Sequence, residues 1–273
     1  MKMIKISAAL ILVWLVSACT NTTVRQHIDH QSLAKDIASV AIIPPDVKIN
    51  LITFDGDNEE LIEEQLAMEK EIISIAKSRF EAEGLEVIEF DIASAVAEDE
   101  DFAYAVTQCV EAWNATKEEL YSTGVVSESK KSTFNSSLGP VANGIAERTG
   151  ADAVFLMDYQ GAKKSKGMIA KDAGTSILIG VLTAGAVVPV QATQSATVDM
   201  ALIDANSGKI IWNNRKFIGV VDSGIVQQAL TELPDVTWKS ELPSDEAAAE
   251  VDEPTKDLDA VKTSPAQEDG SES

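Results

Sequence analysis

The feature that most limits the possible folds is a change of apolar period early in the chain. Residues 39–43 form a short apolar run rich in β-branched side chains that two prolines end, which is typical of a buried strand. Residues 58–83 then repeat apolar side chains at helical spacing, with Gly84 placed to end the helix. A second strand-like segment, 85–90, follows. Strand, helix and strand with short joins predict a βαβ unit with a parallel strand pair.

The remaining segments extend this pattern into a mixed sheet. Residues 153–157 have the uniformly apolar composition of a central strand, and residues 196–204 and 209–217 predict a hairpin closed by the turn 205–208. Helices are expected over residues 91–123, 138–148 and 224–230, with a loop rich in Ser, Lys and Thr over 127–137. The predicted fold class is therefore α/β (α+β), a single mixed sheet of about five strands with helices packed on it.

The N-terminus carries the marks of an export signal. Lys2 and Lys5 give residues 1–18 a positive start, and residues 6–16 form an unbroken run of apolar or small side chains. As a helix this run would span ~16 Å, which is short of the ~30 Å hydrocarbon core of a bilayer. We therefore interpret residues 1–18 as a signal peptide rather than a membrane-spanning anchor.

A specific motif ends this segment. Val16, Ser17, Ala18 and Cys19 place an aliphatic residue and two small ones before a cysteine, which resembles the lipobox of bacterial lipoproteins. The resemblance implies that signal peptidase recognises Val16, Ser17 and Ala18, and that the thiol of Cys19 carries a diacylglyceryl group. Several acyl chains, at about 0.8 kcal/mol per buried methylene, hold a protein on a membrane without a spanning helix. Thr20, in place of a retaining aspartate, implies sorting to the outer membrane, facing the periplasm.

Charge and composition set the limits of the folded part. The chain has 44 acidic and 22 basic residues and a net charge of -22, so its surface repels phosphate and nucleic acid is excluded as a partner. Residues 233–273 are acidic and poor in large apolar side chains, which predicts a disordered tail. Residues 19–37 are polar and predict a lipidated tether, in which His27 and His30 are solvated and bind no metal. The folded domain is expected over residues 38–232.

The order of these elements resembles a known group of proteins. A strand ending at Pro44 and Pro45 precedes a long helix, residues 148–154 (Arg-Thr-Gly-Ala-Asp-Ala-Val) lead into a strand, and residues 202–212 (Leu-Ile-Asp-Ala-Asn-Ser-Gly-Lys-Ile-Ile-Trp) form a hairpin. Together they resemble bacterial envelope lipoproteins with an anticodon-binding-like α/β domain, a group that includes the curli-secretion pore subunit and an activator of peptidoglycan synthases. These motifs specify turns and strand ends, so the resemblance implies a fold more directly than a function.

An uncharged apolar insert lies between two of the predicted strands. Residues 177–190 contain two glycines and a proline but no charged side chain. The candidate interaction or membrane residues in this insert are Ile177, Leu178, Ile179, Val181, Leu182, Val187 and Val188. Three interpretations are open: a buried helix or loop on the sheet, a surface element for a partner or for self-association, and a membrane-inserted hairpin. The lack of alternation between apolar and polar positions argues against the hairpin.

The sequence contains no catalytic motif. It has no Gly-x-Ser-x-Gly elbow, no phosphate-binding loop that ends in Gly-Lys-Ser/Thr and no His-Glu-x-x-His, and Cys109 lies on an apolar helix face, where a core role is expected. We therefore expect no enzyme activity, no cofactor and no metal. The leading hypothesis is a lipid-anchored outer-membrane lipoprotein that binds another envelope protein. The alternative is a homo-oligomeric, ring-forming export channel that resembles the curli secretion pore.

Overall fold

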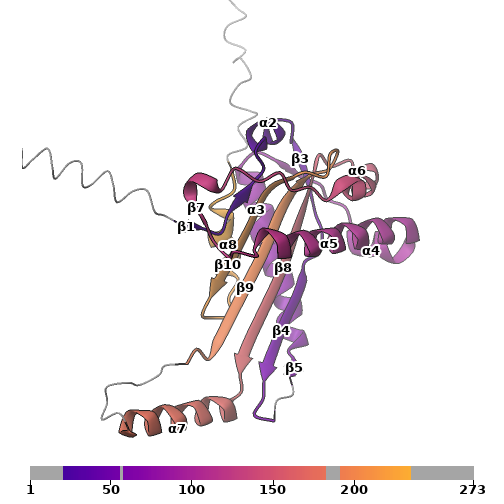
Figure 1. Cartoon of the computed structure of the whole chain (residues 1–273). Helices are drawn as coiled ribbons and strands as arrows, with labels where there is room; N and C mark the ends of the chain where they lie inside the picture. The colour runs from indigo at the N-terminus through magenta and orange to yellow at the C-terminus, as the bar shows by residue number, and fades with distance from the viewer. Residues whose placement is uncertain (1–20, 56–57, 183–190, 235–273) are drawn as a thin grey trace, which may run out of the picture. The chain divides into compact units, whose positions relative to one another are not determined.

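An eight-stranded mixed sheet forms the centre of the computed structural model, which describes residues 21–55, 58–182 and 191–234. The strand order is β2-β10-β9-β8-β3-β6, and β4 pairs with β8 on one side and with β5 on the other (Figure 1). The strands are β2 (Arg25–Gln26), β3 (Ser39–Ile42), β4 (Asp46–Ile52), β5 (Asn58–Glu60), β6 (Glu86–Val87), β8 (Ala153–Lys164), β9 (Gln194–Asp204) and β10 (Ile210–Ile218).

The prediction of about five strands was too low, although the mixed α/β class is confirmed. The strands β2, β4 and β5 were not predicted. The Arg-Gln of β2 and the Asn-Glu-Glu of β5 have no apolar pattern of their own, so pairing with neighbouring strands decides their conformation. The apolar pattern of β4 is incomplete, yet it pairs along its whole length with β8.

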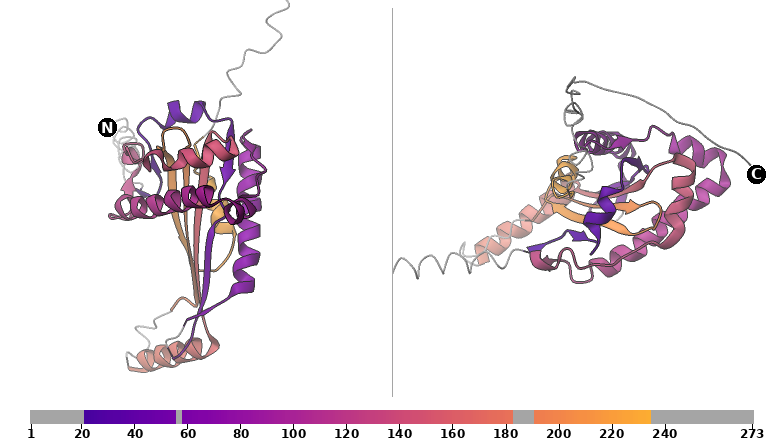
Figure 2. Two further views of the ribbon diagram at one scale, coloured as in Figure 1. Left: turned by 90° about the vertical axis from the view of Figure 1, so that its right-hand side faces the viewer. Right: turned by 90° about the horizontal axis from the view of Figure 1, so that it is seen from above.

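Helices cover the sheet from both sides, as the two views in Figure 2 show. One core packs α3 and α8 against one face, and a second core packs α4, α5 and α6 against the other. The described α-helices are α2 (His30–Lys35), α3 (Ile62–Ala82), α4 (Ile92–Glu98), α5 (Glu100–Leu120), α6 (Asn143–Thr149), α7 (Lys166–Leu182) and α8 (Gly224–Leu230). Two 3-10 turns, η1 (Glu128–Lys130) and η2 (Gly139–Ala142), and a small sheet of β1 (Asn21–Thr22) with β7 (Val126–Ser127) complete the fold.

The predicted strand connections are confirmed. β3 pairs in parallel with β6 and with β8, as the βαβ unit requires, and β8, β9 and β10 run antiparallel to one another. Gly208, in the predicted hairpin turn, has a φ of 67°, and a Cβ there would lie 1.7 Å from the carbonyl oxygen of Gly139. Only glycine fits this turn, because both the left-handed backbone and the close approach exclude a side chain.

The element boundaries differ from the sequence predictions at several places. The long helix starts at Ile62 instead of residue 58, since Asn58–Glu60 forms β5. Asp99 divides the segment 91–123 into α4 and α5, because its side chain accepts hydrogen bonds from the amides of Asp101 and Phe102 and so caps α5.

The polar segment after Cys19 is folded where we expected a tether. β2 pairs with β10, and Val24, Arg25 and His27 are each 1% exposed. His27 is therefore a core residue, although the prediction placed it in solvent. Polarity was misleading here because Arg25 donates to main-chain carbonyls and Nδ1 of His27 accepts from the amide of Asp29, so both side chains are held inside the fold. Residues 19 and 20 and the acidic tail beyond residue 234 lie outside the described residues.

Candidate interaction surface

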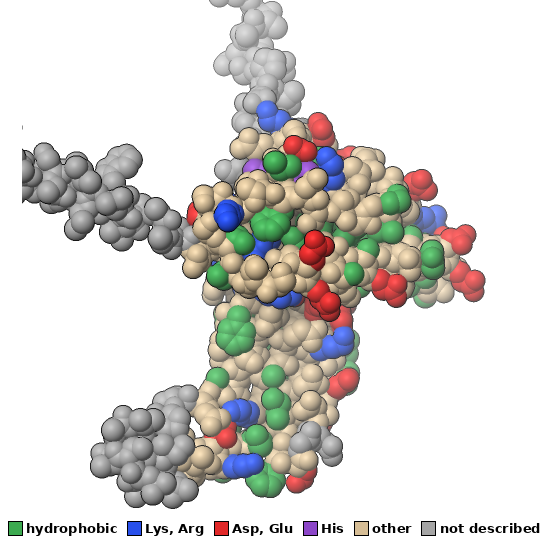
Figure 3. Space-filling model, viewed as in Figure 1, with side chains coloured by type: hydrophobic (Ala, Val, Ile, Leu, Met, Phe, Trp, Pro, Cys, Tyr) green, Lys and Arg blue, Asp and Glu red, His purple; other side chains and the backbone are tan. Residues whose placement is uncertain are grey.

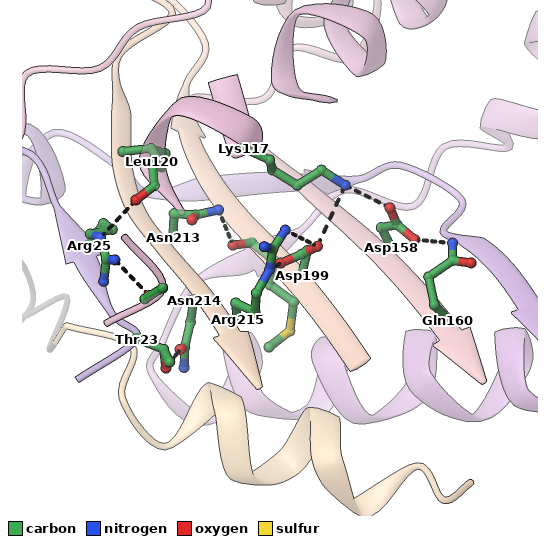
Figure 4. Close-up of polar contacts among 12 residues, drawn as sticks. Thr23, Arg25, Lys117, Leu120, Asp158, Gln160, Asp199, Asn213, Asn214 and Arg215 are labelled. Atoms are coloured by element: carbon green, nitrogen blue, oxygen red, sulfur yellow. Dashed lines mark hydrogen bonds and ion pairs between the residues drawn. The ribbon is translucent and has the colours of Figure 1, made fainter. Parts of the chain in front are cut away.

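A row of charged side chains crosses four strands where helix α5 ends above the sheet. Strand register places Asp46 of β4 beside Asp158 of β8, Asp158 beside Asp199 of β9, and Asp199 beside Arg215 of β10. Lys117, near the end of α5, reaches down to this row (Figure 4). Its Nζ lies 2.6 Å from Oδ2 of Asp158 and 3.7 Å from Oδ2 of Asp199. We call these five residues the charged row.

Two cations and two carboxylates of the row balance in charge: Lys117 and Arg215 against Asp158 and Asp199. Arg215 donates to both carboxylate oxygens of Asp199, at 2.6 and 2.9 Å, and this pairing raises the pKa of Arg215. Gln160 donates to Oδ1 of Asp158 at 2.6 Å. The side chains of Lys117, Asp158 and Asp199 are 8%, 16% and 9% exposed, so the ion pairs of Lys117 are largely desolvated. Such pairs fix a single geometry, because loss of either partner leaves a charge buried without compensation.

Aromatic rings hold the cations in place from above. The ring of Tyr121 lies between two guanidinium groups, 4.3 Å from Arg215 and 4.9 Å from Arg25, and Lys117 lies 4.2 Å from the ring of Trp113. Burial raises the pKa of Tyr121, so its hydroxyl stays neutral at physiological pH. The ring contacts and ion pairs together join the end of α5 to the sheet.

The groups near the charged row are arranged for structure. Cys109 is fully buried, and burial raises the pKa of its thiol to about 12, so it is not a thiolate at neutral pH. A cavity of about 60 Å³ beside Asp46, Trp113 and Asp158 has room for water, whereas metabolite sites usually exceed about 300 Å³. Within the described residues there is no group of three side chains that could hold a metal ion.

No described helix covers the next row of side chains on the same face. Lys48 of β4 lies beside Gln160 of β8, Gln160 beside Thr197 of β9, and Thr197 beside Phe217 of β10. We call these four residues the open face. Lys48, Gln160 and Phe217 are exposed, Phe217 by 69%, and Thr197 is partly exposed. In Figure 3 hydrophobic, basic and acidic side chains are mixed on this part of the molecule, below α5.

The opposite face of the same strands is closed. Ile49, Tyr159 and Val198 alternate with the open-face residues along β4, β8 and β9, and each is 0% exposed in the core under α3 and α8. The four strands therefore extend past α5 as a sheet that the described helices cover on one side (Figure 1).

Comparison with known proteins gives few and weak matches. No protein-family model and no curated protein matches the chain. Among solved structures, the lipoprotein GNA1162 from Neisseria meningitidis aligns over 79% of this chain and 99% of its own, with 13% identity and a TM-score of 0.28. The PelC dodecamer from Paraburkholderia phytofirmans aligns over 73% and 86%, with 9% identity and a TM-score of 0.28. The LpoB C-terminal domain from Salmonella enterica aligns over 70% and 92%, with 14% identity and a TM-score of 0.23.

The TM-scores of these three alignments are too low to establish a common fold. The charged row and the open face therefore have to be interpreted from this chain alone.

None of the predicted site residues belongs to the charged row or the open face, and several lie outside the described residues. Val16, Ser17, Ala18 and Cys19 precede the described residues, and Val187 and Val188 fall in the gap 183–190. The backbone of residues 177–182 is helical and forms the last part of α7. None of the described helices is both long and apolar enough to cross a membrane.

Sequence reasoning missed the charged row and the open face. One signal was present: Asp158 directly follows the apolar run 153–157, and Asp199 interrupts another apolar strand. A charge inside a buried strand needs a partner, but register and helix placement decide that the partners are Lys117 and Arg215.

Proposed function

We propose that this protein is a non-enzymatic lipoprotein of the bacterial envelope that binds another envelope protein through its open face. Acyl chains on Cys19 hold it at the outer membrane, facing the periplasm. The lipobox, the export signal and the absence of a catalytic motif support this proposal from the sequence.

The open face is the observation that carries the binding role. Interfaces between proteins commonly combine an aromatic anchor with surrounding polar groups. Phe217 is such an aromatic, and Lys48, Gln160 and Thr197 extend the same face across three further strands. The charged row beside it fixes the strands and α5, so a partner meets a surface that loses little conformational freedom on binding.

The export channel is the less favoured alternative. A membrane-inserted hairpin requires extended strands, whereas residues 177–182 continue helix α7. This part of the insert agrees better with a helix that packs on another surface.

Photo-crosslinking in living cells tests the binding role. A photoreactive phenylalanine analogue at Phe217 should give a specific adduct with an envelope protein. The matched control is Tyr104 on α5, an aromatic side chain that is 67% exposed but does not lie on the open face. Equal labelling at both positions, or no adduct at Phe217, would contradict the proposal. Mass spectrometry of the same purified protein should show a diacylated Cys19 as the first residue.

A further inference from the structure

The folded part of the chain begins two residues after the proposed lipid anchor. β1 starts at Asn21, so Thr20 alone separates it from Cys19. Two residues span at most ~7 Å, whereas the tether expected from Cys19 to Ala38 would reach about 60 Å. If Cys19 is acylated as proposed above, the body has almost no freedom to move away from the membrane.

Main-chain pairing holds the segment that follows Cys19 on both sides. Asn21 and Thr22 pair with β7, and Arg25 and Gln26 pair with β10. The amide of Gln26 donates to the carbonyl of Lys131 at 2.7 Å, which extends the pairing beyond β7. This segment therefore cannot act as a spacer unless part of the sheet opens.

Arg25 fastens the segment to the end of α5 and to the loop that follows it. Its guanidinium donates to the carbonyls of Leu120, at 3.3 Å, and Gly124, at 2.9 Å, and to two carbonyls of its own strand segment. The residue is 1% exposed, and its charge lies against the rings of Tyr121 and Phe134. Detaching residues 21–25 would remove these hydrogen bonds from a buried cation, so the position of Asn21 and Thr22 is fixed relative to β7.

The stretch that pairs with Asn21 and Thr22 differs in charge from the chain as a whole. Residues 122–131, which contain β7 and η1, include two lysines and one glutamate, in a chain whose net charge is -22. Val125 in this stretch is 47% exposed. We call Asn21, Thr22 and residues 122–131 the anchor corner. A corner that lacks net negative charge can approach anionic headgroups without the repulsion that the acidic remainder would meet.

We propose that the anchor corner rests on the phospholipid bilayer and that Arg25 fixes the protein in this one orientation. The lipid on Cys19 holds the membrane headgroups within the length of two residues, ~7 Å, of Asn21. The bilayer is therefore the surface that faces the anchor corner. The open face is then held at a fixed height, and its partner binds close to the membrane.

Energy transfer to labelled vesicles tests the orientation. The full-length lipidated protein is reconstituted in vesicles of phosphatidylethanolamine and phosphatidylglycerol that carry a rhodamine lipid. A fluorophore is attached at Val125→Cys in one variant and at Asn58→Cys in another. Asn58 is the distal control. Through β4 it lies level with Lys164 at the end of β8, whereas β2 joins the sheet ~26 Å away along the strand direction. The buried thiol of Cys109 stays unlabelled.

We expect higher transfer efficiency from position 125 than from position 58. A flexible Gly-Ser linker of about ten residues, inserted between Thr20 and Asn21, spans ~18 Å and should remove the difference without touching a folded residue. Equal transfer from both labels in protein that floats with the vesicles would overturn the orientation and leave the lipoprotein proposal standing. If the protein does not float with the vesicles, or if the Cys19→Ser variant still floats, both the orientation and the lipoprotein proposal are overturned.

Discussion

Replacing Lys117 with methionine tests whether the charged row holds the end of α5 on the sheet. Methionine keeps most of the length and the apolar stem of lysine, so packing over the ring of Trp113 is largely retained. The change removes the cation that lies 2.6 Å from Asp158 and 3.7 Å from Asp199. The loss of stability therefore reports the charge more than the volume.

The structure sets the size of the effect. Breaking a buried pair by removing one partner costs about 3–5 kcal/mol when the remaining charge is uncompensated. Here Asp199 keeps both hydrogen bonds from Arg215, and Asp158 keeps Gln160 and a side chain that is 16% exposed. We therefore expect a loss near the lower limit, about 3 kcal/mol, or roughly 1 M in the urea midpoint.

Urea unfolding followed by circular dichroism, in detergent solution, measures this loss. The matched control is Lys131→Met, which breaks a half-exposed pair with Glu128 and should change the free energy of unfolding by less than about 1 kcal/mol. Adding Asp158→Asn to the Lys117 variant removes one uncompensated charge and should restore part of the loss. If Lys117→Met and Lys131→Met were equally stable, the charged row would not have the role that we assign to it.

Three further predictions concern the turn, the buried histidine and the thiol. Gly208→Ala should lower the free energy of unfolding more than Gly150→Ala does, because a Cβ meets a carbonyl oxygen at position 208 and nothing within 4 Å at position 150. The Gly150 variant should lose only the cost of the left-handed backbone, about 1–2 kcal/mol. Equal losses in urea unfolding would contradict this. Burial lowers the pKa of His27, so the folded protein binds fewer protons there than the unfolded chain, and stability should fall as pH drops below about 6.5. Urea midpoints at several pH values should show a smaller fall in His27→Asn, which keeps an acceptor for the main-chain amide that bonds Nδ1; an unchanged fall would reject the assignment. Cys109 should not react with a thiol reagent at pH 8 in the folded protein, because its pKa is about 12, and should react in urea.

Local patterns predicted the elements that have strong periodicity of their own. Residues 153–157 were correctly placed in a central strand, and residues 224–230 form α8 with the predicted bounds. The turn at residues 205–208 was predicted from its Asn-Ser-Gly chemistry. These predictions succeeded because apolar spacing and turn residues act within a few positions along the chain.

The same reasoning failed where a distant partner decides the outcome. Arg25 and His27 look like residues of a solvated tether, but β10 and the loop after α5 bury them. Lys117, Asp158 and Asp199 are far apart in the sequence, and strand register and the placement of α5 bring them together.

The sequence by itself predicts an export signal and a lipidation site at Cys19, and it indicated the mixed α/β class that the structure has, since these patterns lie in contiguous residues. Tertiary structure decided that residues 21–37 are folded, that the charged row exists and that the described elements leave one face of the sheet open. The physical reason is that a polar side chain has no fixed environment in a sequence: whether water or a buried partner satisfies it depends on contacts with residues far away in the chain.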